Sequence, residues 1–136
     1  MANALYDKGR EKFLRGEIAW QTDQIKAVLV DMADYPGFSL SSNEFLSDIP
    51  VGARVATTAS FTGKTTTNGV ADADDPVFTA ASGDQSEAIV IYKDTGTAAT
   101  SPLIAYIDTA TGLPVTPNTG DINVIFDNGS NKIFKL

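Results

Sequence analysis

The residues best suited to chemistry are the acidic ones, and three of them gather between positions 72 and 75. Asp72, Asp74 and Asp75 have the adjacent and alternating spacing with which carboxylate oxygens can hold Ca²⁺. The complete calcium-loop pattern also needs a central glycine and a final bidentate glutamate, and the sequence has neither at these positions. We interpret 72–75 as a solvated acidic loop, and the sequence alone leaves Ca²⁺ binding by this loop open.

Two further signals for ligand binding are weak. The Gly-Lys-Thr stretch at 63–65 resembles the end of a phosphate-binding loop, but the first glycine of that motif is replaced by Thr58. The small-residue stretch 95–101 could form a flexible loop that touches a ligand, but it has no aromatic platform. Trp20 and Tyr92 could form a separate surface that stacks on a sugar. A single tryptophan is more often part of a hydrophobic core.

The chain has no histidine and no cysteine. It therefore lacks the commonest general base, the commonest transition-metal ligand and any thiolate. An enzyme built from this sequence would depend on carboxylates, Lys, Ser or Tyr, and the paired carboxylates of a glycoside hydrolase meet only in space. No residue is nominated as catalytic, cofactor-binding or metal-binding, so we expect a protein that is not an enzyme and needs no cofactor.

The charge balance argues against nucleic acid as a partner. Seventeen Asp and Glu against ten Lys and Arg give a net charge of −7, and the basic residues are scattered except at 8–15. Residues 1–16 lack the apolar centre of a signal peptide, and no apolar run approaches the length of a membrane span. We expect a protein made in the cytoplasm, with neither nucleic acid nor a membrane as its partner.

Two apolar runs organise the fold that must position these residues. Residues 88–92 (AIVIY) and 103–107 (LIAYI) each have the length of one strand and are rich in β-branched and aromatic side chains. Apolar residues occupy both alternating positions of each run, which predicts strands that are covered on both faces. We predict a β-hairpin at the centre of an antiparallel β protein.

Further short strands are predicted on both sides of this hairpin, with no βαβ alternation. The stretch 25–31 could also form a helix over 23–32, because several of its residues favour helices. Asp127-Asn128-Gly129 predicts a hairpin turn between the last two strands. The chain is therefore predicted to be all-β, with an antiparallel β-sandwich or jelly-roll domain over 17–136. The strands are expected at 18–20, 25–31, 54–59, 64–67, 77–80, 121–127 and 132–136.

Residues 1–16 are predicted to form a short N-terminal helix or arm. Asn3 could cap a helix from Ala4, and Gly16 could stop it. The apolar side of this helix has two interpretations: it packs on its own domain, or it docks on a neighbouring subunit. The candidate interface residues are Leu5, Tyr6, Phe13, Leu14 and Trp20.

Three stretches of the sequence carry a resemblance to a known family. They are MANALYDKGREKFLRGEIAW, IKAVLVDMADY and VIYKDTGTAATSPLIAYIDTATGLPVTPNTGDINVIFDNGSNKIFKL, which together cover roughly two-thirds of the chain. The chain resembles small virion structural proteins of tailed bacteriophages that are described as cement or decoration proteins. The middle of the chain, about 36–84, matches less clearly.

The resemblance implies a role but no catalytic site. It implies a β-sandwich or jelly-roll protein on the outside of an HK97-type capsid, where it stabilises capsomer junctions. The expected partners are the major capsid protein and further copies of the chain, as a dimer or trimer. A tail or head-to-tail component and a host-glycan-binding module are the alternatives, and copy number per virion would separate the first of these from a cement protein.

Overall fold

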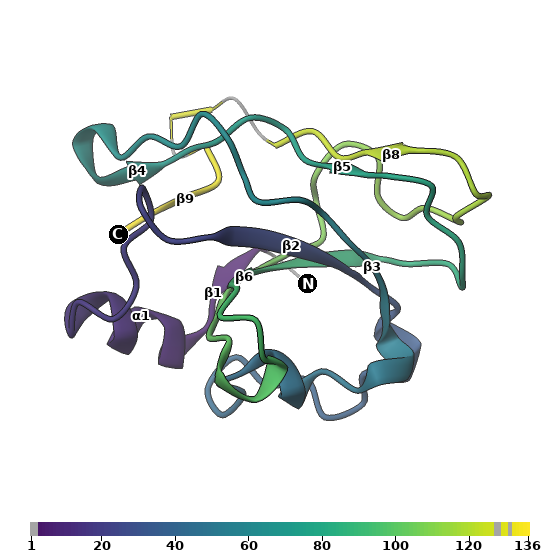
Figure 1. The fold of residues 1–136 in the computed structure, drawn as a ribbon, viewed down its shortest axis with the longest axis horizontal. Helices are drawn as coiled ribbons and strands as arrows, with labels where there is room; N and C mark the ends of the chain where they lie inside the picture. The colour runs from purple at the N-terminus through teal and green to yellow at the C-terminus, as the bar shows by residue number, and fades with distance from the viewer. Residues whose placement is uncertain (1–2, 127–128, 131) are drawn as a thin grey trace.

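The computed structural model describes residues 3–126, 129, 130 and 132–136. Its described residues form a mainly antiparallel β structure with the α-helix α1 and several short 3₁₀ turns (Figure 1). None of the helices in this described part is long and apolar enough to cross a membrane. The helix is α1 (Asp7–Leu14), and the strands are β1 (Ala4–Leu5), β2 (Ile25–Val30), β3 (Arg54–Thr57), β4 (Val70–Ala71), β5 (Val77–Phe78), β6 (Ala88–Lys93), β7 (Leu103–Ile107), β8 (Ile122–Asn123) and β9 (Phe134–Lys135).

The main sheet has five strands in the order β1-β7-β6-β2-β3. All its neighbours are antiparallel, and the predicted central hairpin is confirmed, with Ile89 opposite Ile107 and Ile91 opposite Ala105. The stretch 25–31 is a strand, β2, that pairs with β6 along its whole length, so the helical alternative is wrong. The pairing of β2 with β6 on one side and with β3 on the other outweighs the helix propensity of its individual residues.

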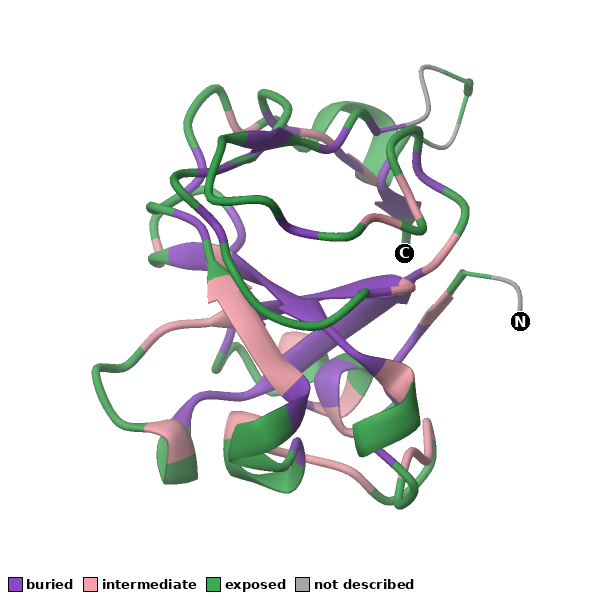
Figure 2. Cartoon of the chain, turned by 90° about the vertical axis from the view of Figure 1, so that its right-hand side faces the viewer, coloured by how far each residue is buried: buried purple, intermediate pink, exposed green. Residues whose placement is uncertain are grey.

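Both faces of the main sheet are covered, as the apolar pattern predicted. Along β6, Ile89 and Ile91 belong to one core, whereas Val90 and Tyr92 belong to another. The first core lies between the main sheet and the two small sheets, and the second lies against the 3₁₀ turns and loops of 32–53. Figure 2 shows the buried sheet between these two layers.

Two small two-stranded sheets, β4–β9 and β5–β8, cover the first core. The last two predicted strands do not pair with each other in this arrangement: β8 pairs with β5 and β9 pairs with β4. Positions 127 and 128 of the predicted turn lie outside the described residues. The predicted strand at 64–67 is also wrong, because this stretch makes only an isolated bridge between Thr65 and Asp72. Both small sheets join segments that are distant in the sequence, which local patterns do not reveal.

The predicted strand at 18–20 is a turn instead. The carboxylate of Asp23 accepts a hydrogen bond from the Ala19 N–H at 2.7 Å, and the Ala19 carbonyl accepts one from the Asp23 N–H at 2.9 Å. Aspartate side chains compete in this way with strand pairing for the backbone groups. Ile18 and Trp20 still point into the first core, so their alternation reflected burial and not strand geometry.

The N-terminal segment combines a strand with a helix. The helix begins at Asp7 rather than Ala4, because Ala4–Leu5 form β1 at the edge of the main sheet. The side-chain oxygen of Asn3 does not cap the helix; it accepts hydrogen bonds from the N–H groups of Asp108 and Thr109 at 3.0 and 3.3 Å. Gly16 follows the helix with φ +75°, as expected for a glycine stop.

Helix α1 lies against the backbone of β7 at Gly9. A Cβ atom at this position would lie 2.6 Å from the carbonyl oxygen of Leu103, which is closer than any ordinary contact. We therefore expect Gly9→Ala to destabilise the protein by about 1 to 3 kcal/mol, although alanine favours helices. Urea denaturation would measure this. Gly37→Ala is the control, since a Cβ there meets nothing within 4 Å; equal behaviour of the two variants would contradict the close approach.

Candidate functional site

Three of the five residues predicted to form an interface are buried in the chain's own cores. Leu5 and Trp20 belong to the first core, and Tyr6 belongs to the second. These side chains have almost no free surface to offer a partner, which corrects the expectation for them. Leu14 is 88 % exposed, and Phe13 is half-buried at the margin of the first core. These two remain as surface candidates.

An apolar hollow lies beside Leu14, between α1 and β9. It has a volume of about 340 Å³, and its rim carries two cationic side chains. Leu136 is 62 % exposed, so two large apolar side chains face solvent close to this hollow. Exposed apolar residues that lie together are more informative than scattered ones, because they mark interaction surfaces. We call this surface the α1–β9 face; it consists of Arg10, Phe13, Leu14, Lys135 and Leu136.

Aromatic packing and one buried cation hold α1 in place under this face. The ring of Phe13 lies 5.9 Å from that of Phe134, which in turn packs edge-on against Trp20 at 5.2 Å. On the inner side of the helix, the ammonium group of Lys12 is buried and forms an ion pair with Glu44 at 2.9 Å. It also lies over the ring of Phe45. The helix is therefore fixed to the domain, and Leu14 is held outward on a rigid element.

The acidic loop at 72–75 does not bring its carboxylates together. Asp72 forms an ion pair with Lys132 at 3.3 Å. Asp74 accepts a hydrogen bond from the Thr62 hydroxyl at 2.9 Å, and Asp75 accepts one from a backbone N–H at 3.0 Å. Each carboxylate has a different partner, and the loop is absent from the groups of described residues that could hold a metal ion.

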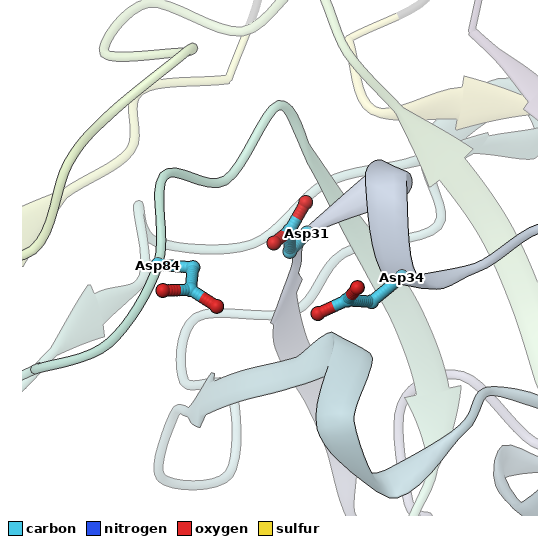
Figure 3. Close-up of side chains that lie close together, drawn as sticks. All are labelled: Asp31, Asp34 and Asp84. Carbon is cyan, nitrogen blue, oxygen red and sulfur yellow. The ribbon is translucent and has the colours of Figure 1, made fainter.

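The structure brings together a different set of acids, Asp31, Asp34 and Asp84 (Figure 3). Each offers an oxygen within 4.8 Å of the others. Asp31 is buried and already accepts a hydrogen bond from the Ala33 N–H at 3.0 Å, whereas the other two are exposed. Sequence reasoning missed this set because Asp84 is far from the other two along the chain. Three carboxylates fall short of the six to eight oxygens that Ca²⁺ prefers, so the cluster alone does not define a site.

The residues proposed for sugar stacking are not exposed. Trp20 and Tyr92 are 5 % and 3 % exposed and belong to different cores. The loop at 95–101 uses its polar groups internally: the Ser101 hydroxyl donates to the Thr97 carbonyl at 2.8 Å, and the Thr95 N–H donates back to that hydroxyl at 3.1 Å. This arrangement removes the aromatic platform on which the glycan-binding alternative rested.

Comparison with known proteins adds no family: no protein-family model matches the chain, and no curated protein matches its sequence.

Proposed function

We propose that this chain is a virion structural protein of a tailed bacteriophage, a cement or decoration protein on the outside of an HK97-type capsid. In this role it binds the major capsid protein and stabilises capsomer junctions, as a dimer or trimer. It is made in the host cytoplasm and ends on the exterior of the virion. Neither nucleic acid nor a membrane is a partner in this proposal, and the protein acts by adhesion and not as an enzyme.

The resemblance of both ends of the sequence to such proteins is the starting point of the proposal. The observation that carries it is the α1–β9 face, where Leu14 and Leu136 are exposed on a rigidly held surface. Burial of one such leucine against a partner contributes about 1.5 to 3 kcal/mol. Because a dimer or trimer would engage several symmetric copies of the shell surface at once, contacts of this size multiply through avidity.

The proposed architecture is a β-sandwich of the jelly-roll type. The main sheet and the two small sheets face each other across the first core, which supports this finer description. A rigid body of this kind suits a protein that bridges neighbouring subunits, because its contact surfaces keep their relative positions.

The first test is whether Leu14 contributes to binding on the shell. We expect Leu14→Asp to fold normally, since the side chain is exposed, and to bind purified shells about tenfold or more weakly, because a buried leucine contact is lost. The matched control is Val51→Asp, which replaces an apolar side chain that is 77 % exposed elsewhere. Occupancy would be measured by quantitative gel analysis of purified particles.

The outcomes separate the alternatives. Equal occupancy of the two variants would remove the α1–β9 face from the shell contact. A wild-type copy number of six or twelve per virion would replace the cement role with that of a tail or head-to-tail component. Absence of the chain from purified virions would overturn the proposal. A point substitution is a cleaner test than deletion of the N-terminal segment, because β1 and α1 are integral to the fold.

A further inference from the structure

Three hollows adjoin one another along the side of the molecule that carries the α1–β9 face, because they share lining residues. The hollow of about 340 Å³ at that face shares Leu5 and Lys135 with a second hollow of about 360 Å³. The second shares Asn3 and Lys132 with a third of about 320 Å³. We call this row of adjoining hollows the edge groove. Each hollow has the volume of a typical ligand pocket, and the row of three offers room for a short stretch of polypeptide.

One wall of the edge groove is the free edge of β1. The N–H of Tyr6 donates to the carbonyl of Ile104 at 2.9 Å, so these two residues form a hydrogen-bonded pair. In an antiparallel ladder bonded and non-bonded pairs alternate, and the next pair, Leu5 opposite Ala105, is therefore non-bonded. The N–H and C=O of Leu5 consequently point away from β7, and β1 is the last strand of the main sheet.

The opposite wall is the free edge of β9. The N–H of Leu136 donates to the carbonyl of Gly69 at 3.1 Å, which makes Lys135 opposite Val70 a non-bonded pair by the same alternation. The N–H and C=O of Lys135 therefore point away from β4. Among the described strands, β9 pairs only with β4. Two strand edges whose outward backbone groups have no partner among the described residues thus line the same groove, and such edges are templates for a further strand.

Cationic side chains line the groove. Arg10, Lys132 and Lys135 line it, and none of its described lining residues is Asp or Glu. This is notable in a chain with a net charge of −7. Among the described residues, Arg10 and Lys132 each have one carboxylate partner, Asp7 and Asp72, whereas Lys135 has none. The unpaired ammonium group of Lys135, in a groove without a described acidic lining residue, therefore favours an acidic occupant.

We propose that the edge groove receives an extended, acidic segment of the shell protein, which adds as a β-strand between β1 and β9. Backbone hydrogen bonds to Leu5 and Lys135 hold the segment, while its alternate side chains contact the cations and the apolar α1–β9 face. This inference rests on the proposed function for the source of the segment. It adds to that function the site, the backbone conformation and the charge of the partner.

The first experiment measures binding to purified shells and to overlapping peptides that tile the major capsid protein. We expect Lys135→Glu to weaken both interactions about fivefold at low salt, which is the effect of about one exposed ion pair. The matched control is Lys8→Glu, which makes the same change in charge at a lysine that does not line the groove. The control should bind within twofold of wild type.

The second experiment tests strand addition itself by amide hydrogen exchange. In the free protein the amide of exposed Lys135 should exchange rapidly, and in the complex with shells or with the bound peptide the amides of both Leu5 and Lys135 should exchange at least about tenfold more slowly than in the free protein. A docking mode that used side chains alone would leave these two amides unprotected. The peptide that binds should also carry more acidic residues than the average overlapping peptide of the major capsid protein.

Failure of this inference differs from failure of the proposed function. If the wild-type protein coats shells, Lys135→Glu binds as tightly as Lys8→Glu, and binding does not slow the exchange of the two amides, the edge groove is not the contact. The cement role would still stand. If the protein does not bind shells, the cement role and this inference fall together. If protection of the two amides instead rises with the concentration of the protein alone, the occupant is a second copy and the shell segment is excluded.

Discussion

Trp20→Ala should lower the free energy of unfolding by about 3 to 5 kcal/mol. The indole packs edge-on against Phe61 and Phe134, with ring centroids 6.2 and 5.2 Å away. Its N–H donates to the carbonyl of Asp72 at 3.1 Å, so the substitution also removes one of the two hydrogen bonds to that carbonyl; the other comes from the Thr65 N–H at 2.9 Å. Since domains are stable by only about 5 to 15 kcal/mol, the melting temperature should fall by about 10 to 20 °C.

Two control variants separate the contribution of the Trp20 indole to stability from that of the exposed Leu14 side chain. Trp20→Phe keeps an aromatic ring but loses the indole hydrogen bond, so we expect a loss of about 1 to 2 kcal/mol. Leu14→Ala should change stability by less than about 0.5 kcal/mol, because that side chain is 88 % exposed. Calorimetry on the three variants would rank them; a stable Trp20→Ala protein would return Trp20 to the surface and to the list of candidate interface residues.

Raising the pH above 10 should unfold the protein. All four tyrosines of the chain lie in the second core. Burial raises the pKa of Tyr92 and of Tyr106 to about 12, with a smaller contribution from the charges of Asp94 and Asp108. Burial also raises the pKa values of Tyr6 and Tyr35. The folded state therefore holds the phenolic protons more tightly than the unfolded chain does.

The direction of the effect follows from these raised pKa values. The stabilising contribution is complete below pH 10, the pKa of an unfolded tyrosine, and is lost progressively as the pH rises to about 12. Tyr92 and Tyr106 each account for about 2 to 3 kcal/mol over this interval. Together with the other two tyrosines, this loss is comparable with the total stability of a domain.

Circular dichroism and tyrosinate absorbance, followed together from pH 7 to 12, would test this. The two signals should change in one coincident transition, because each tyrosine ionises when the core opens. Tyr92→Phe and Tyr106→Phe should each make the loss of stability above pH 10 less steep. Tyrosines that ionise near pH 10 without loss of structure would contradict their placement in the second core. With no histidine in the chain, stability should vary little between pH 6 and 8.

The covered central strands show where sequence reasoning works well. Apolar residues at both alternating positions of 88–92 and 103–107 predicted a hairpin buried on both faces, and β6 and β7 have that arrangement. The signal is reliable because burial on two faces leaves no polar position in a strand. The glycine stop at Gly16 was predictable for a similar local reason, since few other residues adopt a positive φ.

The candidate site was predicted only in part. The sequence marked Leu5, Tyr6, Phe13, Leu14 and Trp20 as an apolar set, but it could not say which of them the fold would cover. That depended on β1 pairing with β7 in the main sheet and on β9 packing over Trp20, which are contacts between segments far apart in the sequence. The acidic set Asp31, Asp34 and Asp84 likewise exists only in three dimensions.

The sequence by itself determined the mainly β character of this protein, its central hairpin, its acidity and its lack of histidine and cysteine. These properties follow from composition and from the alternation of neighbouring residues, and they do not depend on contacts between distant parts of the chain. Only the tertiary structure decided which apolar residues are core and which are surface, and that two free strand edges and three cations line one groove. Such features depend on pairings between residues far apart in the chain, and side-chain periodicity contains no information about the partner of an edge.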